Sequence, residues 1–300
     1  MLNFVLFGLT ALLAHGEPQT GSDLQLHSIS SGGMTRYYRI HVPPSYQAGV
    51  PTPLVLAYHG GGGNARQFAD SSNLNDASDR HGFLLVYPEG TGILGGWPFF
   101  WVETWNAGGC CGWAQENDID DVGFTRDMLD DIESKWSVDP KAVFATGHSN
   151  GGMMSYRLGI ELSDRIVAIG PNATCLIFNQ TPPTPIPVIA FHGKLDCNVP
   201  FQGGLGCGIS GVSMTSQTDS LTPFIQVNQA QVPQTYEEQR GDAFRIEFPA
   251  PATGADIRYW WMRDHGHAWP GHGSAIGDPF NTDIDINEEL WLFFDQHRRP

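Results

Sequence analysis

The chain has 300 residues, of which 41% are hydrophobic and 16% are charged, and this composition is typical of a globular protein rather than a disordered one. The 32 acidic side chains outnumber the 16 Lys and Arg residues, which gives a formal net charge of -16. Because such a surface repels phosphate backbones and anionic headgroups, the composition argues against nucleic-acid binding and against docking on a membrane.

The N-terminal segment has the pattern of a secretory signal peptide. Residues 2–14 form an apolar run that is too short to span a bilayer, and small residues follow at the usual cleavage spacing. A buried first strand or helix is the alternative, but the polar stretch EPQTGSD comes directly afterwards. We therefore predict that residues 1–16 are removed, that residues 17–300 form a single domain, and that the protein is secreted.

Short apolar runs alternate with helical patterns along the rest of the chain. Strands are predicted at residues 36–42, 53–58, 83–87, 142–146, 166–169, 187–191 and 257–262. Helices are predicted at residues 121–136, 151–162 and 285–297, and Asp120 or Asp121 can cap the first of them. This alternation implies an α/β fold with a mostly parallel central sheet and helices on both faces.

A glycine-rich segment, HGGGG at residues 59–63, follows the strand predicted at 53–58. Gly-rich backbone can point N–H groups into a cavity without steric cost, and such groups stabilise a developing oxyanion. A plain flexible turn is the simple alternative, whereas a phosphate-binding loop is disfavoured because no Gly-Lys-Ser/Thr follows. We predict that Gly61 supplies one donor of an oxyanion hole.

The segment GHSNG at residues 147–151 lies between a predicted strand and a predicted helix. In this arrangement the serine stands on a strained turn, and the flanking glycines let strand and helix approach each other closely. The alternative is a chance match in a glycine-rich chain. The context predicts that Ser149 is a nucleophile and that the N–H of Asn150 is the second oxyanion donor.

The other two members of a catalytic triad are expected later in the chain, in the order Ser, Asp, His. Asp196 follows the strand predicted at 187–191, whereas the aspartates at 118–121 precede the serine and suit a helix cap. After the last strand, His267 is the predicted base and His265 is its rival. Three neighbouring histidines could also suggest a metal site, but they do not share a helix face, so we expect no metal and no cofactor.

Five cysteines are expected to pair in part in an oxidising compartment. Cys197 and Cys207 bracket a glycine-rich loop and are predicted to form a local bridge. Cys110 and Cys111 can form a vicinal bridge, or one of them can pair with Cys175. No Cys-x-x-Cys spacing supports a zinc site.

Two N-glycosylation sequons begin at Asn172 and Asn179. They are compatible with a secreted glycoprotein, although such triplets also arise often by chance.

Six segments together resemble the polyhydroxybutyrate depolymerase-like and feruloyl esterase branch of secreted α/β-hydrolases. They are HGGGGN at 59–64, WNAGGCCG at 105–112, DIDDVGFTRDMLDDI at 118–132, GHSNGGMMSYRL at 147–158, HGKLDCNVPFQGG at 192–204 and HGHAWPG at 265–271. The resemblance implies a serine triad of Ser149, Asp196 and His267. Residues 204–226 depart from it as an insertion, which affects the expected specificity more than the chemistry.

The expected function is hydrolysis of hydroxycinnamoyl esters of plant cell-wall polysaccharide by a monomeric serine esterase. The resemblance leaves two alternatives, a polyester depolymerase and an acetylxylan esterase, and a non-catalytic carbohydrate-binding protein or a peptidase is a rival on the same scaffold. Aromatic faces suit phenolic and sugar rings, so we predict that Trp101, Trp105 and Trp269 contact substrate. Core packing is the competing explanation for these indoles.

Overall fold

The computed structural model describes residues 21–92, 102–208, 210–233, 237–274 and 276–299. The predicted signal peptide and Trp101 lie outside the described residues.

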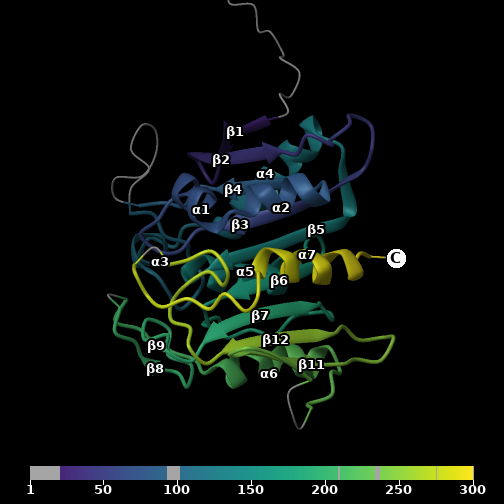
Figure 1. Cartoon of the computed structure of the whole chain (residues 1–300). Helices are drawn as coiled ribbons and strands as arrows, with labels where there is room; N and C mark the ends of the chain where they lie inside the picture. Colours follow the sequence, from purple (N-terminus) through teal and green to yellow (C-terminus); the bar gives the residue numbers. More distant parts are fainter. Residues whose placement is uncertain (1–20, 93–101, 209, 234–236, 275, 300) are drawn as a thin grey trace, which may run out of the picture.

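The described residues fold around a ten-stranded sheet with the order β1-β2-β4-β3-β5-β6-β7-β12-β11-β10. In that order the strands are Gly21–Ser31, Met34–Val42, Leu84–Pro88, Thr52–Tyr58, Val138–His148, Ala168–Asn172, Val188–Gly193, Ile257–Met262, Ala243–Phe248 and Glu238–Arg240. The strands from β4 to β12 in this order pair in parallel, whereas β1, β2, β11 and β10 pair antiparallel at the two edges. Figure 1 shows β1 and β2 at one edge of the sheet and β11 at the other.

Most of the helices lie in the connections between strands, and the last helix follows the last strand, β12. They are α1 (Ala65–Ser72), α2 (Leu74–His81), α3 (Gly112–Glu116), α4 (Asp121–Lys135), α5 (Asn150–Glu161), α6 (Gln217–Val227) and α7 (Ile286–Gln296). A short hairpin, β8 (Gly204–Leu205) and β9 (Ser213–Met214), lies in the predicted insertion. The side chain of Asp120 accepts a hydrogen bond from Gly123 N–H, so Asp120 is the cap of α4.

Two apolar cores flank the sheet, because successive side chains of a strand point to opposite faces. In β3, Leu54, Leu56 and Tyr58 belong to one core, and Val55 and Ala57 belong to the other. Side chains of α4, α5 and α6 complete the first core, and those of α1, α2 and α7 complete the second. Burial on both faces explains why the central strands are continuous apolar runs.

The predicted mostly parallel sheet with helices on both faces is confirmed, and each of the predicted strands and helices is present within a few residues of its expected bounds. The sequence patterns missed the edge strands β1, β10 and β11 and the helices α1, α2, α3 and α6.

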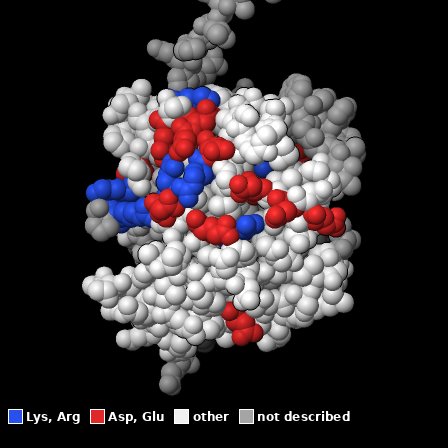
Figure 2. All heavy atoms as spheres, turned by 180° about the vertical axis from the view of Figure 1, so that it is seen from behind, with Lys and Arg blue, Asp and Glu red and all other residues white. Residues whose placement is uncertain are grey.

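Charged side chains are unevenly distributed on the face opposite to the view of Figure 1. Figure 2 shows acidic and basic residues side by side over the upper part of that face and few charges over the lower part. Among the described residues, no helix combines the length and the apolar character needed to cross a membrane.

Candidate active site

The serine of the GHSNG segment stands on a strained turn between β5 and α5. Ser149 has φ 55° and ψ -122°, a backbone conformation that residues other than glycine rarely adopt. A Cβ atom on Gly147 would lie 2.4 Å from the backbone of Gly151, and one on Gly151 would lie 2.1 Å from the Tyr58 carbonyl oxygen. Both glycines are therefore required by close packing, which leaves the Ser149 side chain at the start of the helix.

His267 and Asp196, the predicted base and acid, form a hydrogen-bonded pair. His267 Nδ1 lies 2.8 Å from Asp196 Oδ2, and Asp196 Oδ1 accepts a hydrogen bond from Val199 N–H at 2.9 Å. Asp196 follows β7, and His267 follows β12, which pairs in parallel with β7. Burial opposes ionisation of Asp196, but the hydrogen bond and the charge of His267 prevail and lower its pKa.

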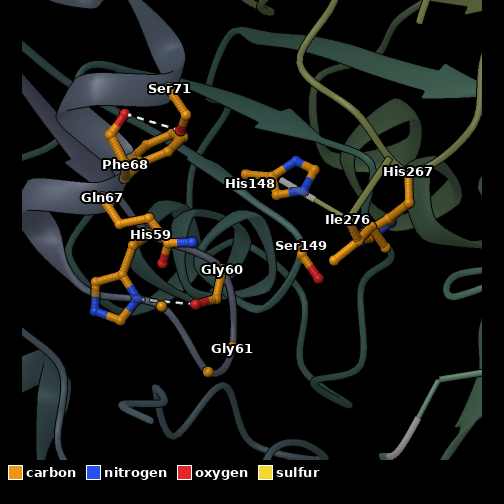
Figure 3. A pocket seen from close by; sticks show the side chains of 12 residues that line it. His59, Gly60, Gly61, Gln67, Phe68, Ser71, His148, Ser149, His267 and Ile276 are labelled. Atoms are coloured by element: carbon orange, nitrogen blue, oxygen red, sulfur yellow. Dashed lines mark hydrogen bonds between the residues drawn. The ribbon is translucent and has the colours of Figure 1, made fainter. Parts of the chain in front are cut away.

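Ser149 and His267 line the same pocket, which has a volume of about 220 Å³. Figure 3 shows Ser149 beside His267, with the loop from His59 to Gly61 on the opposite side of the pocket. Among the hydrogen bonds of the described residues, none joins Ser149 Oγ to His267, so the expected contact is absent in this state. Catalytic hydrogen bonds of this kind are often long without substrate and tighten when it binds.

The rival base, His265, has a structural role. Its ring is fully buried, its Nδ1 accepts a hydrogen bond from Asn281 N–H at 2.8 Å, and its Nε2 lies 3.2 Å from the Ala268 carbonyl oxygen. Both ring nitrogens are thus engaged within the protein. His272 is likewise held by Asp285 and Asn287, which leaves His267 as the histidine of this loop that reaches the pocket.

His148 is a site residue that the sequence analysis did not single out. Its ring lies 4.6 Å from the His267 ring and accepts a hydrogen bond at Nδ1 from the Asn172 amide at 3.0 Å. Burial, and then the neighbouring His267, hold the pKa of His148 well below its usual value, so the ring is neutral. The sequence did contain a signal for His148: it directly precedes Ser149 in the G-x-S-x-G segment, so its side chain is expected near the nucleophile.

The glycine loop and the start of α5 meet beside Ser149. A Cβ on Gly60 would lie 3.4 Å from Ser149 Cβ, and one on Gly61 would lie 3.4 Å from Asn150 Cβ. Gly62 N–H and Gly63 N–H are already bonded to other carbonyl groups. Asn150 is the first residue of α5, so its backbone N–H has no partner within the helix and is open to a ligand.

The predicted tryptophan contacts need correction. Trp105 is fully buried behind the glycine loop, where its Nε1–H donates to the His59 carbonyl and its backbone bonds twice with the Asn150 side chain. Trp269 is also buried, with its Nε1–H bonded to Asn287 Oδ1. Neither indole lines the pocket formed by the described residues; Phe68 of α1 and Ile276 supply its large apolar side chains instead.

The predicted bridge between Cys197 and Cys207 is present, and Cys110 and Cys111 pair with each other rather than with Cys175. The Cα atoms of Cys197 and Cys207 lie 5.4 Å apart. Cys175 is a buried free thiol.

The two sequons differ in accessibility. Asn172 is fully buried, and its amide group bonds to His148 and to the Ala268 carbonyl, so it cannot carry a glycan in the folded protein. Asn179 is exposed.

One group of side chains in the described part of the chain has the composition of a metal site. His59, Glu89 and Glu103 place one ligand atom each within 4.8 Å of one another, behind the glycine loop.

Comparison with known proteins identifies esterases as similar to this chain. Residues 36–182 match the family model described as esterase PHB depolymerase. Feruloyl esterase B of Piromyces equi is 33% identical over 183 residues, which are 59% of this chain and 32% of that protein. Feruloyl esterase D of Neurospora crassa is 24% identical over 314 residues, which are 98% of this chain and 96% of that protein. The chain therefore spans about a third of the length of the first of these relatives.

The solved structure of an acetyl xylan esterase from Aspergillus awamori superimposes with a TM-score of 0.60 at 14% identity, covering 90% of this chain and 98% of that one. This likeness and the sheet order define the fold as that of an α/β-hydrolase. The sequence matches narrow the class further: residues 36–182 belong to the esterase PHB depolymerase family, and the chain is similar to proteins named feruloyl esterases.

Proposed function

We propose that the protein is a serine carboxylesterase that uses Ser149, His267 and Asp196. The observation that carries this proposal is the hydrogen-bonded His267–Asp196 pair, which lies at the pocket of a serine held on a strained turn. His267 takes the proton of Ser149 as the hydroxyl attacks the ester carbonyl, and Asp196 orients the imidazole and stabilises its charged form. Protonated His267 then gives its proton to the departing alcohol as the tetrahedral intermediate collapses to the acyl-enzyme. Water, deprotonated by the same histidine, hydrolyses the acyl-enzyme and frees Ser149.

The oxyanion hole in this proposal consists of the N–H groups of Gly61 and Asn150. Both residues lie against each other beside Ser149, as the contacts of their Cβ positions indicate. Trp105 supports the arrangement, since it fixes the Asn150 side chain and the His59 carbonyl from behind. Such preorganised donors stabilise the tetrahedral intermediate without moving during the reaction.

The substrate in this proposal is a hydroxycinnamoyl ester of plant cell-wall polysaccharide. The relatives are named feruloyl esterases, and Phe68 lines the pocket where an aromatic acyl ring can stack. A pocket of about 220 Å³ is smaller than those that enclose a drug-sized ligand, so it suits the acyl group while the polysaccharide stays outside. The family description favours an aliphatic polyester as the second candidate.

A substrate panel tests the function. Methyl ferulate, acetylated xylan, a hydroxybutyrate oligomer and a peptide are compared for wild type and Ser149→Ala. We expect methyl ferulate to be cleaved fastest and Ser149→Ala to lose about a millionfold in kcat while keeping its fold, as triad serine knockouts do. If Ser149→Ala keeps a tenth of the wild-type rate, Ser149 is not the nucleophile. If neither the esters nor the peptide are cleaved, the non-catalytic alternative remains, and cleavage of the peptide alone would favour a peptidase.

Phe68→Leu tests the aromatic contact in the pocket. Ring stacking contributes about 0.5–1.5 kcal/mol beyond burial, which corresponds to roughly a twofold to tenfold loss of kcat/KM for methyl ferulate. The rate with a short aliphatic ester is the internal control and should change less. An equal loss for both substrates would mean that Phe68 serves packing alone.

We also propose that the mature protein is secreted, starts at residue 17 and is a monomer. Mass spectrometry of the N-terminus from culture medium and light scattering of the purified protein test these three statements. An intact N-terminus or a stable dimer contradicts the corresponding one.

A further inference from the structure

The side chain of Glu103 is buried directly behind the glycine loop. The exposed fractions of the His59 and Glu103 side chains are 1% and 0%, and neither carboxylate oxygen of Glu103 has a hydrogen-bond donor. One of these oxygens lies within 4.8 Å of a carboxylate oxygen of Glu89 and of a ring nitrogen of His59. A buried carboxylate without donors is strongly disfavoured, so this site must hold either a proton or a cation.

The surrounding charges favour a single proton. Glu89 is paired with Arg39 at 2.9 Å, and Asp121 is paired with Arg36 at 2.7 Å. Within each of these two ion pairs the positive and the negative charge cancel. Glu103 is therefore the only one of these five charged side chains without a partner of opposite charge. One proton makes the cluster neutral, whereas a divalent cation would leave an excess positive charge in a buried site.

The third member of the group is neutral and already has its hydrogen bonds. His59 Nε2 accepts from Gly90 N–H at 3.1 Å, so the ring proton is on Nδ1, which lies 2.9 Å from the Gly60 carbonyl oxygen. Burial lowers the pKa of His59 and keeps the ring uncharged. Its Nε2 lone pair is thus occupied, which further disfavours metal binding.

Glu103 is also bonded to the glycine loop through its backbone. Gly62 N–H donates to the Glu103 carbonyl at 2.8 Å, and Glu103 N–H donates to the Gly63 carbonyl at 3.3 Å. Trp105, two residues further on, holds the Asn150 side chain. Any movement of this segment therefore displaces both of the proposed oxyanion donors.

We propose that Glu103 is a neutral carboxylic acid whose O–H donates a hydrogen bond to a carboxylate oxygen of Glu89, and that in this form it is a positioning residue which keeps the oxyanion loop in place. This inference rests on the proposed function, because the loop matters only if it stabilises an oxyanion. Ionised Glu103 would face ionised Glu89 and drive the segment at 102–105 away from the loop.

Burial, and then the charge of Glu89, raise the pKa of Glu103 to about 9, against a smaller opposing effect of Arg36. The acid form therefore persists at neutral pH and is lost in mildly alkaline solution.

Infrared spectroscopy of the resting protein tests the proton without using activity. At pH 7, wild type should show a carbonyl stretching band of a protonated carboxylic acid that is missing in Glu103→Gln. Failure to find this band overturns the proposal even if the protein is an active esterase. The band, if present, supports it even if the substrate panel shows no ester hydrolysis.

The alkaline limb of kcat tests the positioning role. With a pKa of about 9, one tenth of the wild-type molecules keep the proton at pH 10, so kcat for methyl ferulate should fall about tenfold between pH 8 and pH 10. Glu103→Gln keeps the neutral hydrogen-bonding shape and should fall less than about twofold, whereas Glu103→Ala should have a lowered kcat at both pH values. Equal pH profiles for wild type and Glu103→Gln overturn the proposal.

Added Zn²⁺ tests the alternative that the group formed by His59, Glu89 and Glu103 binds a cation. If Zn²⁺ raises the Tm of wild type but not of Glu103→Gln, the group is a cation site and the proton assignment is wrong. The same Tm response in both proteins supports the proton.

Discussion

At the scale of single residues, Asp196 and Glu103 show how the same functional group acquires opposite properties. Burial disfavours the ionised form of both. Asp196 receives hydrogen bonds from His267 and from Val199 N–H, and its pKa is lowered. Glu103 receives none and faces another carboxylate, and its pKa is raised. One carboxyl group is therefore prepared to stabilise a cation, and the other to donate a hydrogen bond.

Asp196→Asn should lower kcat by about four orders of magnitude with little change in fold. The amide keeps the shape of the side chain, but its NH₂ group favours the wrong tautomer of His267. Turnover of methyl ferulate and circular dichroism measure the two effects. Asp70→Asn, at an exposed position of α1, is the control and should behave as wild type. A loss of less than tenfold in Asp196→Asn would contradict the assignment of the triad acid.

The sequence predicted the triad candidates but could not establish which of the neighbouring histidines is the base. That choice depends on Asn281, whose N–H occupies the ring nitrogen of His265 from a position 16 residues away in the chain. The tryptophan prediction failed at Trp105 and Trp269 for a related reason. An indole near a catalytic motif can serve the pocket or the layer behind it, and the partners of Trp105 and Trp269 are known only from the folded structure.

At the scale of elements, the contact between β5, α5 and β3 determines where the serine stands. Gly151 lies against the backbone of Tyr58 and His59 without room for a side chain. The helix can therefore begin immediately after the strand, and the turn between them is compressed into Ser149. This packing explains why the glycines of the motif are as necessary as its serine.

Gly151→Ala should destabilise the protein by about 3 kcal/mol or more, because the added Cβ overlaps two carbonyl groups of the backbone. Urea unfolding followed by tryptophan fluorescence measures the change. The matched control is Gly61→Ala, whose Cβ would meet its nearest neighbour at 3.4 Å, an ordinary contact distance. Equal stability of the two variants would show that the strand and helix can separate at little cost.

The central elements were predictable because burial on both faces produces unbroken apolar runs. The edge strands were not, since only part of each is covered: β10 has no fully buried residue, and β11 alternates irregularly between buried and half-buried positions. Helix α1 was missed although its residues Gln67, Phe68 and Ser71 line the pocket. Its apolar residues Ala65, Phe68 and Ala69 have the spacing of one helical face, but the helix has only eight residues, which is too short a stretch for this period to be distinguished from chance.

At the scale of the whole molecule, buried titratable groups make stability depend on pH. Five histidines have lowered pKa values, chiefly through burial: His27, His59, His148, His192 and His265. Three carboxyl groups have raised pKa values, also chiefly through burial: Glu103, Asp121 and Glu247. As the pH falls below 6.5, the unfolded chain protonates these five histidines more completely than the native state does, while the native state keeps at most three carboxyl protons that the unfolded chain has released.

The free energy of unfolding should therefore fall as the pH is lowered from about 6.5 to 4.5, because the unfolded state binds more protons. The pKa of His192, lowered by burial to about 4, by itself corresponds to about 3 kcal/mol once the pH is below that value. Urea unfolding at pH 7, 5.5 and 4.5 measures the change. A free energy that stays constant or rises over this interval would show that the buried histidines accept protons in the native state.

The burial of Asn172 bears on how the protein is made in a host that glycosylates its secretory cargo. Asn172 ends β6 and lies inside the finished fold, where its amide holds His148 and the loop that carries His267. A glycan attached to the growing chain at this position would keep β6 from its place beside β5. In a chain that enters such a pathway, glycosylation and folding would compete for the same residue, and each molecule modified first would be lost from the active pool. The yield then depends on how quickly β6 enters the sheet, a rate that the stability of the finished protein does not reveal.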